Sequence, residues 1–248
     1  MGEWHADVGL GLGVLAALYV WTTRRAEERL GSARSLAMLG ALIVLAGALN
    51  GPLHDLSDRY LFSAHMVQHL LLTLVVPPLL LSSLTPGRIA PLFTIPGVVS
   101  ILRRLTRAPI AFVLYNSVLV IWHVPGPYNA ALEWHPLHVL QHLTLMSTAT
   151  LAWWPILSPA PDLPGASYPA QMLYLFLLGI PMTAVAALVT MADVPLYSVY
   201  SAAPRVAGLS PLEDQRLGGL IMWIPGTAVP FVAFTAVFFR WASAERDE

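Results

Sequence analysis

The sequence predicts an all-α membrane protein, a bundle of seven transmembrane helices, on three observations. The 248 residues are 56% hydrophobic and only 11% charged, whereas soluble globular domains carry about 25% charged residues. The apolar residues form seven segments of nearly membrane-spanning length, and arginines concentrate in alternate connections between these segments. A chain with so little charge cannot cover a water-facing surface, so most of its area must face lipid.

Each segment approaches the length that a membrane span requires, about 20 apolar residues with a range of about 17–25. The segments are 7–23, 35–51, 61–84, 107–123, 137–157, 168–191 and 215–239. The first has acidic Glu3 and Asp7 before it and Arg24 and Arg25 after it. A signal peptide has the opposite polarity, with its positive charges first, so we keep this segment as a true helix.

Arginine placement predicts that the N-terminus faces outward and the C-terminus faces the cytoplasm. The first connection and the third connection hold four arginines each, whereas the second has only Arg59 and the fourth has none. The positive-inside rule therefore puts the two arginine-rich connections in the cytoplasm. We expect one transmembrane domain over 1–241 and a short cytoplasmic tail over 242–248, in a bacterial inner (plasma) membrane.

The composition also excludes several classes of function. The 13 basic and 14 acidic residues nearly balance, so no nucleic-acid partner is expected. Cysteine is absent, which excludes disulfides, thiolate metal sites and thiol redox chemistry. A site for a soft metal would have to use histidine, methionine or carboxylate ligands.

The clearest functional signal is the pattern HxxQHL, which occurs at 65–70 and again at 138–143. Each copy places two imidazoles four residues apart on one helix face, with a glutamine beside them: His65, Gln68 and His69, then His138, Gln141 and His142. Both helices run inward from the outer side, so packing them together would gather four imidazoles at one depth. Imidazole is a usual ligand of copper and zinc, and the glutamines could orient it.

The other candidate ligands fall at the same outer level. All eight histidines lie on the predicted outer side, and His54 and His123 precede the two HxxQHL pairs. The second and third segments and the fourth and fifth segments therefore look like two parallel repeats. Asp214 and Met222 lie near the outer end of the last segment, and methionine thioethers select Cu(I). His5 is expected to belong to a solvated tail.

Three classes of protein are open on these residues. A copper-handling protein needs histidine and methionine near the outer surface and no catalytic machinery, which fits. A protein with two stacked haems would need histidine pairs about four helical turns apart, but a single haem b near the outer face remains an alternative. A metal-dependent hydrolase would need an acid beside the metal, and HExxH is absent. A transporter would need polar residues near the midplane. The segments are almost wholly apolar there, so transport across the membrane is disfavoured.

Further motifs accompany the histidines. They are FSAHMVQHL at 62–70, PPLL at 77–80, WH at 122–123, the stretch 138–155, PLY at 195–197 and DQRLGGLIMW at 214–223. With these motifs the chain, from about residue 40 to 235, resembles the integral-membrane CtaG family of cytochrome c oxidase assembly factors. The HxxQHL pair together with DQxxGGxxMW is the specific part of the resemblance. A single-helix copper chaperone shares the CtaG name, but it uses cysteines, which this chain lacks.

The resemblance implies a metallochaperone without turnover chemistry, which matures respiratory haem–copper oxidases by delivering copper to the oxidase catalytic subunit. The candidate functional residues carried over by matching position are His65, His69, His138, His142, Asp214 and Met222. Membrane lipid and a periplasmic copper donor are the other expected partners. Our hypothesis is that His54, His123 and the paired imidazoles capture copper and pass it to the client by ligand exchange. A resident accessory subunit of a respiratory oxidase remains an alternative.

Overall fold

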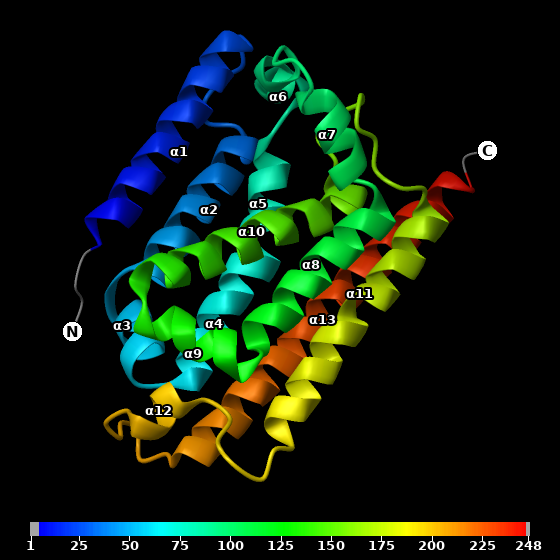
Figure 1. The fold of residues 1–248 in the computed structure, drawn as a ribbon. Coiled ribbons are helices and arrows are strands. Elements are labelled where there is room, and N and C mark those ends of the chain that lie inside the picture. Colours follow the sequence, from blue (N-terminus) through cyan, green and yellow to red (C-terminus); the bar gives the residue numbers. More distant parts are fainter. Residues whose placement is uncertain (1–4, 247–248) are drawn as a thin grey trace.

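The computed structural model describes residues 5–246, and those residues form helices and connections without any strand (Figure 1). The helices are α1 (Ala6–Arg25), α2 (Ala33–Leu49), α3 (Gly51–Arg59), α4 (Phe62–Leu70), the π-helical turn η1 (Leu71–Val75), α5 (Val76–Ser83), α6 (Pro86–Phe93), α7 (Val98–Leu105), α8 (Ala108–His123), α9 (Pro125–Glu133), α10 (His135–Leu157), α11 (Tyr168–Thr190), α12 (Ser198–Ala202) and α13 (Pro211–Ala244). Each of the seven predicted segments coincides with a helix, so the all-α prediction is confirmed.

Four stretches of helix are long and apolar enough to cross a membrane: α1, α4 through α5, α11 and α13. Two bent pairs, α2 with α3 at 43° and α7 with α8 at 76°, would raise the number to six. Helix α10 has 23 residues, but its histidines, glutamine and threonines make it less apolar than the others. The chain is therefore a membrane protein with several spans, while the count of seven spans and the orientation stay predictions.

Helix α13 shows how local sequence sets the helix boundaries. Ser210 and Glu213 form a reciprocal capping box, with Pro211 in the first turn, and the helix then runs for 34 residues through two internal prolines. It ends at Ala244. The predicted tail at 242–248 therefore begins inside this helix, and its residues 247–248 lie outside the described part of the chain.

The third predicted segment is not a uniform α-helix, because a π-helical turn interrupts it just before Pro77 and Pro78. Neither proline has an N–H group, so the carbonyl of Thr73 lacks a donor from the next turn of its own helix. The indole of Trp153 on α10 supplies that donor, with 3.1 Å between Nε1 and the carbonyl oxygen. The turn thus ties the α4–α5 stretch to α10.

Helix α13 lies along α11 for most of its length and contacts α4 at its first turns (Figure 1). Adjacent glycines allow this close packing. A methyl group at Gly218 would collide with the ring of Phe62, and one at Gly219 would collide with the hydroxyl of Thr190. Small residues at helix interfaces in membranes serve this purpose, which explains the GG of the DQRLGG motif.

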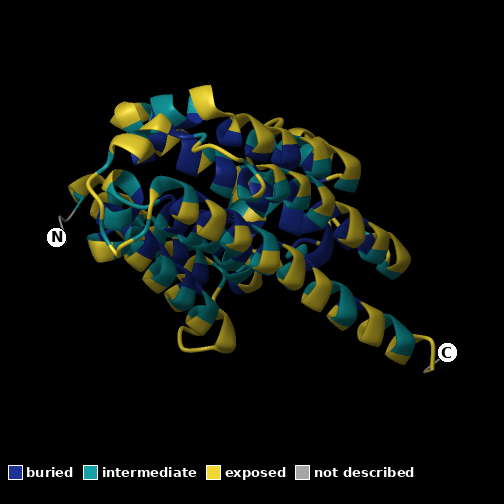
Figure 2. Ribbon diagram, turned by 90° about the horizontal axis from the view of Figure 1, so that it is seen from below, coloured by how far each residue is buried: buried dark blue, intermediate teal, exposed yellow. Residues whose placement is uncertain are grey.

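The buried residues lie between the helices, whereas the outward faces carry exposed apolar side chains (Figure 2). Leu188 on α11 and Phe231 on α13 are 73% and 67% exposed. Such surfaces suit contact with lipid rather than water. The connections that were expected to be loops before the HxxQHL segments are in fact nine-residue helices, α3 and α9.

Candidate metal centre

All eight histidines form one continuous cluster on the side of the bundle where α3, α4, α9 and α10 meet. In space the rings follow one another in the order His135, His5, His54, His138, His142, His65, His69 and His123, and the centroids of neighbouring rings are 4.2 to 6.2 Å apart. The four paired imidazoles therefore meet as their spacing predicts. His5 is not a free tail residue, because its ring contacts that of His54 and its N–H donates to Asn50.

The centre of the cluster is a triad of buried imidazoles, His65, His138 and His142. One nitrogen from each ring lies within 4.8 Å of the others. Metal–imidazole bonds are about 2.0–2.1 Å long, so tetrahedral or trigonal ligands lie closer than this upper bound. A modest inward movement of the rings would let the three nitrogens bind one ion.

His65 has a defined tautomer because of Tyr200 on α12. The Tyr200 hydroxyl donates to the carbonyl of Ser57 at 2.6 Å and lies 3.0 Å from Nδ1 of His65. Burial raises the pKa of Tyr200 well above its ordinary value, so the hydroxyl stays neutral with its single proton directed at Ser57. His65 must then donate from Nδ1, which leaves its Nε2 as an acceptor for the Nε2–H of His69. That Nε2 lies 2.7 Å from Nε2 of His69.

Asp58 on α3 is a functional candidate that the sequence interpretation missed. One of its carboxylate oxygens lies 3.4 Å from Nδ1 of His138 and 3.4 Å from Nε2 of His54. Carboxylates in this position orient metal-binding imidazoles and raise their basicity. The signal was present in the sequence, because Asp58 follows His54 by four residues, but that spacing matters only in a helix.

The two motif glutamines have different surroundings. Gln68 donates to the carbonyl of Ala48 at 2.8 Å and lies 3.0 Å from Nδ1 of His54. It therefore orients His54 rather than the imidazoles of its own helix. Gln141 is fully buried, and neither of its amide atoms has a hydrogen-bond partner.

Unpaired polar atoms concentrate in this cluster. Of the twelve buried side-chain nitrogens and oxygens without a partner in the described residues, six belong to His69, His123, His138, Gln141 and His142. Leaving a buried polar group unpaired costs about 1–3 kcal/mol, so natural proteins rarely gather several such groups. An ion bound by the imidazoles would satisfy the histidine nitrogens among them, and neutral nitrogen donors in a thiol-free site suit copper or zinc.

Asp214, a predicted ligand, has another role. Its carboxylate accepts hydrogen bonds from the backbone N–H of Phe62 at 2.7 Å, the N–H of Ser63 at 3.1 Å and the Ser63 hydroxyl at 2.5 Å. Both oxygens are therefore used to hold the first turn of α4, whose next residues include His65. The neighbouring Gln215 accepts from Leu196 N–H at 2.6 Å, which connects the DQ motif to the PLY motif.

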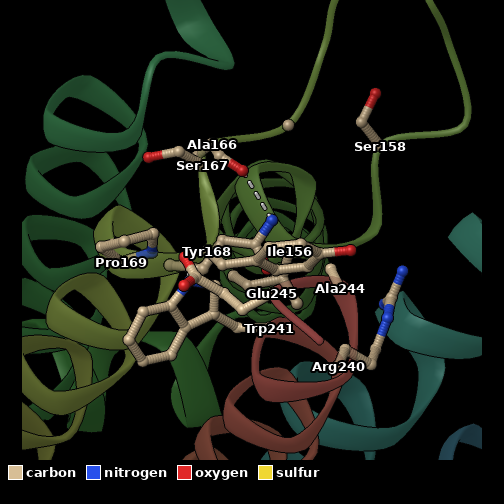
Figure 3. A pocket seen from close by; sticks show the side chains of 12 residues that line it. Ile156, Ser158, Ala166, Ser167, Tyr168, Pro169, Arg240, Trp241, Ala244 and Glu245 are labelled. Carbon is tan, nitrogen blue, oxygen red and sulfur yellow. Dashed lines mark hydrogen bonds between the residues drawn. The ribbon is translucent and has the colours of Figure 1, made fainter. Parts of the chain in front are cut away.

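A cavity of about 460 Å³ between α1, α2 and α10 leads to the cluster, and its lining includes His54, His138 and His142. At its rim, His135 lies 3.6 Å from the carboxylate of Asp7. A larger cavity of about 600 Å³ lies near the C-terminal end of α13, between Tyr168, Arg240 and Trp241 (Figure 3). No histidine lines the larger cavity, so it is separate from the candidate metal centre.

The fold and the cluster define a helical membrane protein with a buried, imidazole-rich centre. The family model described as cytochrome c oxidase caa3 assembly factor (Caa3_CtaG) matches residues 17–244. The chain therefore belongs to this family, which confirms the resemblance and assigns the protein to cytochrome c oxidase assembly. Searches of curated proteins and of solved structures found no significant match.

Proposed function

We propose that this chain binds copper at the triad of His65, His138 and His142 and delivers it to the catalytic subunit of the oxidase. The observation that carries the proposal is the buried triad of imidazoles, with the Nε2 atoms of His138 and His142 unpaired, in a member of an oxidase assembly family. The same observation makes zinc a competitor, since imidazole binds both metals.

The chemistry needed is ligand exchange. Asp58 and Tyr200 fix the orientations of two of the imidazoles, so copper binding requires little further ordering of these rings. Three neutral nitrogen ligands leave copper able to accept an incoming imidazole from the client. We assign no turnover chemistry to the chain, because the carboxylate of Asp58 beside the triad is engaged by two imidazoles.

The proposed orientation places the cluster on the outer side of a bacterial plasma membrane. Seven spans follow if α10 crosses as well as the four apolar stretches and the two bent pairs. The arginine distribution then puts the N-terminus outside and the C-terminus in the cytoplasm. A periplasmic donor would reach the cluster through the cavity between α1, α2 and α10.

The test is Cu(II) binding by the purified full chain, measured by elemental analysis, electron paramagnetic resonance and visible absorption. We expect about one tightly bound Cu(II) per chain with nitrogen hyperfine structure, and loss of that signal in H138A/H142A. H135A is the matched control, because His135 is a largely exposed rim residue. Retention of the nitrogen signal in H138A/H142A would show that the triad is not the site.

Other outcomes would replace the proposal. A haem absorption band would favour the single-haem alternative. Bound zinc that Cu(II) cannot displace would remove copper from the assignment. Stoichiometric copurification with mature oxidase subunits would favour a resident accessory subunit. In cells, we expect H138A/H142A to lower the copper content of the oxidase while H135A leaves it unchanged.

A further inference from the structure

A second group of metal-binding side chains lies beside the triad, around a small cavity closed by α4, α8, α10, α11 and α13. The cavity has a volume of about 10 Å³, which is close to the smallest space that holds one water molecule. Three of the eight methionines of the chain line it: Met66, Met182 and Met222. These side chains are 1%, 5% and 2% exposed.

Two imidazoles with an unused nitrogen line the same cavity. His123 donates from Nδ1 to the carbonyl of Leu119 at 2.7 Å, which fixes its tautomer and leaves a lone pair on Nε2. That Nε2 is buried and has no partner. His69 faces His65 through Nε2, and its Nδ1 is likewise buried without a partner. The ring centroids of His69 and His123 are 5.8 Å apart.

Methionine often only fills gaps in a core, but the surroundings of Met182 indicate a set position. A Cβ atom at Gly226 on α13 would collide with the sulfur of Met182. Glycine is unfavourable inside a helix by about 1 kcal/mol relative to alanine. At this position it leaves the space that the sulfur of Met182 occupies. A water molecule in the cavity could satisfy the imidazoles, but it would gain little from three thioethers.

We propose that this cavity is a second metal site, selective for Cu(I), with its ligands drawn from His69, His123 and the thioethers of Met66, Met182 and Met222. Thioether and imidazole ligands are neutral and soft, which favours Cu(I) over Zn²⁺ and Cu(II). Among the described residues no carboxylate lines the cavity, so a monovalent ion is less costly there than a divalent one.

The inference rests on the proposed function for the route by which copper arrives. His69 contacts both groups, since its Nε2 faces the triad through His65 and its other nitrogen belongs to the second site. Cu(I) bound by the triad would therefore need to move by only one imidazole to reach the thioethers, with no change of oxidation state. The second site would hold Cu(I) until the client removes it.

The experiment is anaerobic loading of the full chain with Cu(I) alone, followed by copper X-ray absorption spectroscopy and metal analysis. We expect sulfur scattering in the wild type, and its loss in M182L/M222L together with a fall from about two bound Cu(I) to about one. Leucine keeps the volume of methionine closely, so the fold should survive. M38L is the control, because Met38 is equally buried at 5% but does not line the cavity.

Absence of sulfur scattering in the loaded wild type would overturn the second site, as would unchanged scattering in M182L/M222L. The triad is tested separately by the nitrogen signal of Cu(II), which M182L/M222L should retain. The wild type could show sulfur-ligated Cu(I) while H138A/H142A still binds Cu(II) normally. That result would support the second site and contradict metal binding by the triad. The two proposals therefore fail in different measurements.

Discussion

The two HxxQHL copies share a sequence pattern and an order of elements, yet their polar groups are satisfied very differently. In each copy a long helix is followed by a nine-residue helix and then by the motif, as α2, α3, α4 and as α8, α9, α10. In the first copy Gln68 is hydrogen-bonded to Ala48 and His54. In the second copy Gln141 and the Nε2 atoms of His138 and His142 have no partner.

The difference indicates a division of roles between the copies. The first copy is held in place by contacts from other elements, namely Asp214 at the start of α4 and Tyr200 at His65. The second copy contributes most of the unused nitrogens. We infer that the first copy is mainly a scaffold that presents His65, while the second copy supplies the ligands that a metal ion would organise.

The largest expected effect is on the scaffold. Asp214→Ala removes the acceptor of three hydrogen bonds at the start of α4 and should lower the free energy of unfolding by about 3 kcal/mol or more. Thermal unfolding in detergent, followed by tryptophan fluorescence, measures this change. Glu213→Ala, one residue away but exposed, is the control and should cause a far smaller loss. Equal losses for both would show that Asp214 does not anchor α4.

Asp58 connects the copies, since it contacts His54 of the first and His138 of the second. Asp58→Asn keeps the shape but removes the charge that supports the imidazole ligand, so copper affinity should fall by about 10- to 100-fold. Competition against a chelator of known affinity measures the change. Asp193→Asn serves as the control, because Asp193 is exposed beyond the end of α11. Unaltered affinity would mean that Asp58 plays no part in orienting His138.

Substitution of the two glutamines tests the comparison directly. Gln68→Leu removes the side-chain donor to the carbonyl of Ala48 and should destabilise the metal-free protein by about 1–3 kcal/mol. Gln141→Leu removes only unpaired atoms and should leave stability unchanged or improve it. Paired thermal unfolding curves measure both variants under one condition. If Gln141→Leu were the more destabilising of the two, the roles assigned to the copies would be reversed.

The smallest expected effect concerns Tyr200. Tyr200→Phe removes the hydroxyl that fixes the His65 tautomer, and copper affinity should fall by about tenfold, at the low end of such contributions. Tyr60→Phe is a suitable control, because Tyr60 is only half-buried, at the end of α3. Chelator competition measures both variants, and a wild-type affinity in Tyr200→Phe would contradict the tautomer argument.

Local spacing made the helices and the paired imidazoles predictable. The four-residue separation within His65/His69 and within His138/His142 sets their helix faces whatever the surrounding fold is. The contacts of Asp58 with His138 and of Tyr200 with His65 were beyond such reasoning, because they join distant segments, 80 and 135 residues apart. The hydrogen bonds from Asp214 to the first turn of α4 were likewise not predictable, because they join residues more than 150 positions apart.

The π-helical turn at Leu71–Val75 sets the direction in which His65 and His69 point around the helix axis, relative to α5. Each residue of a helix turns the chain by about 100°, and a π-helical turn holds one residue more than an α-helical turn. Deleting a single residue there would restore a regular helix and swing His65 and His69 by roughly that angle relative to Pro77 and the α5 stretch. The apolar pattern of the span would survive almost intact, yet the two imidazoles would point away from α10. An alignment gap of one residue in this turn would therefore mark a chain that keeps the fold and loses the centre.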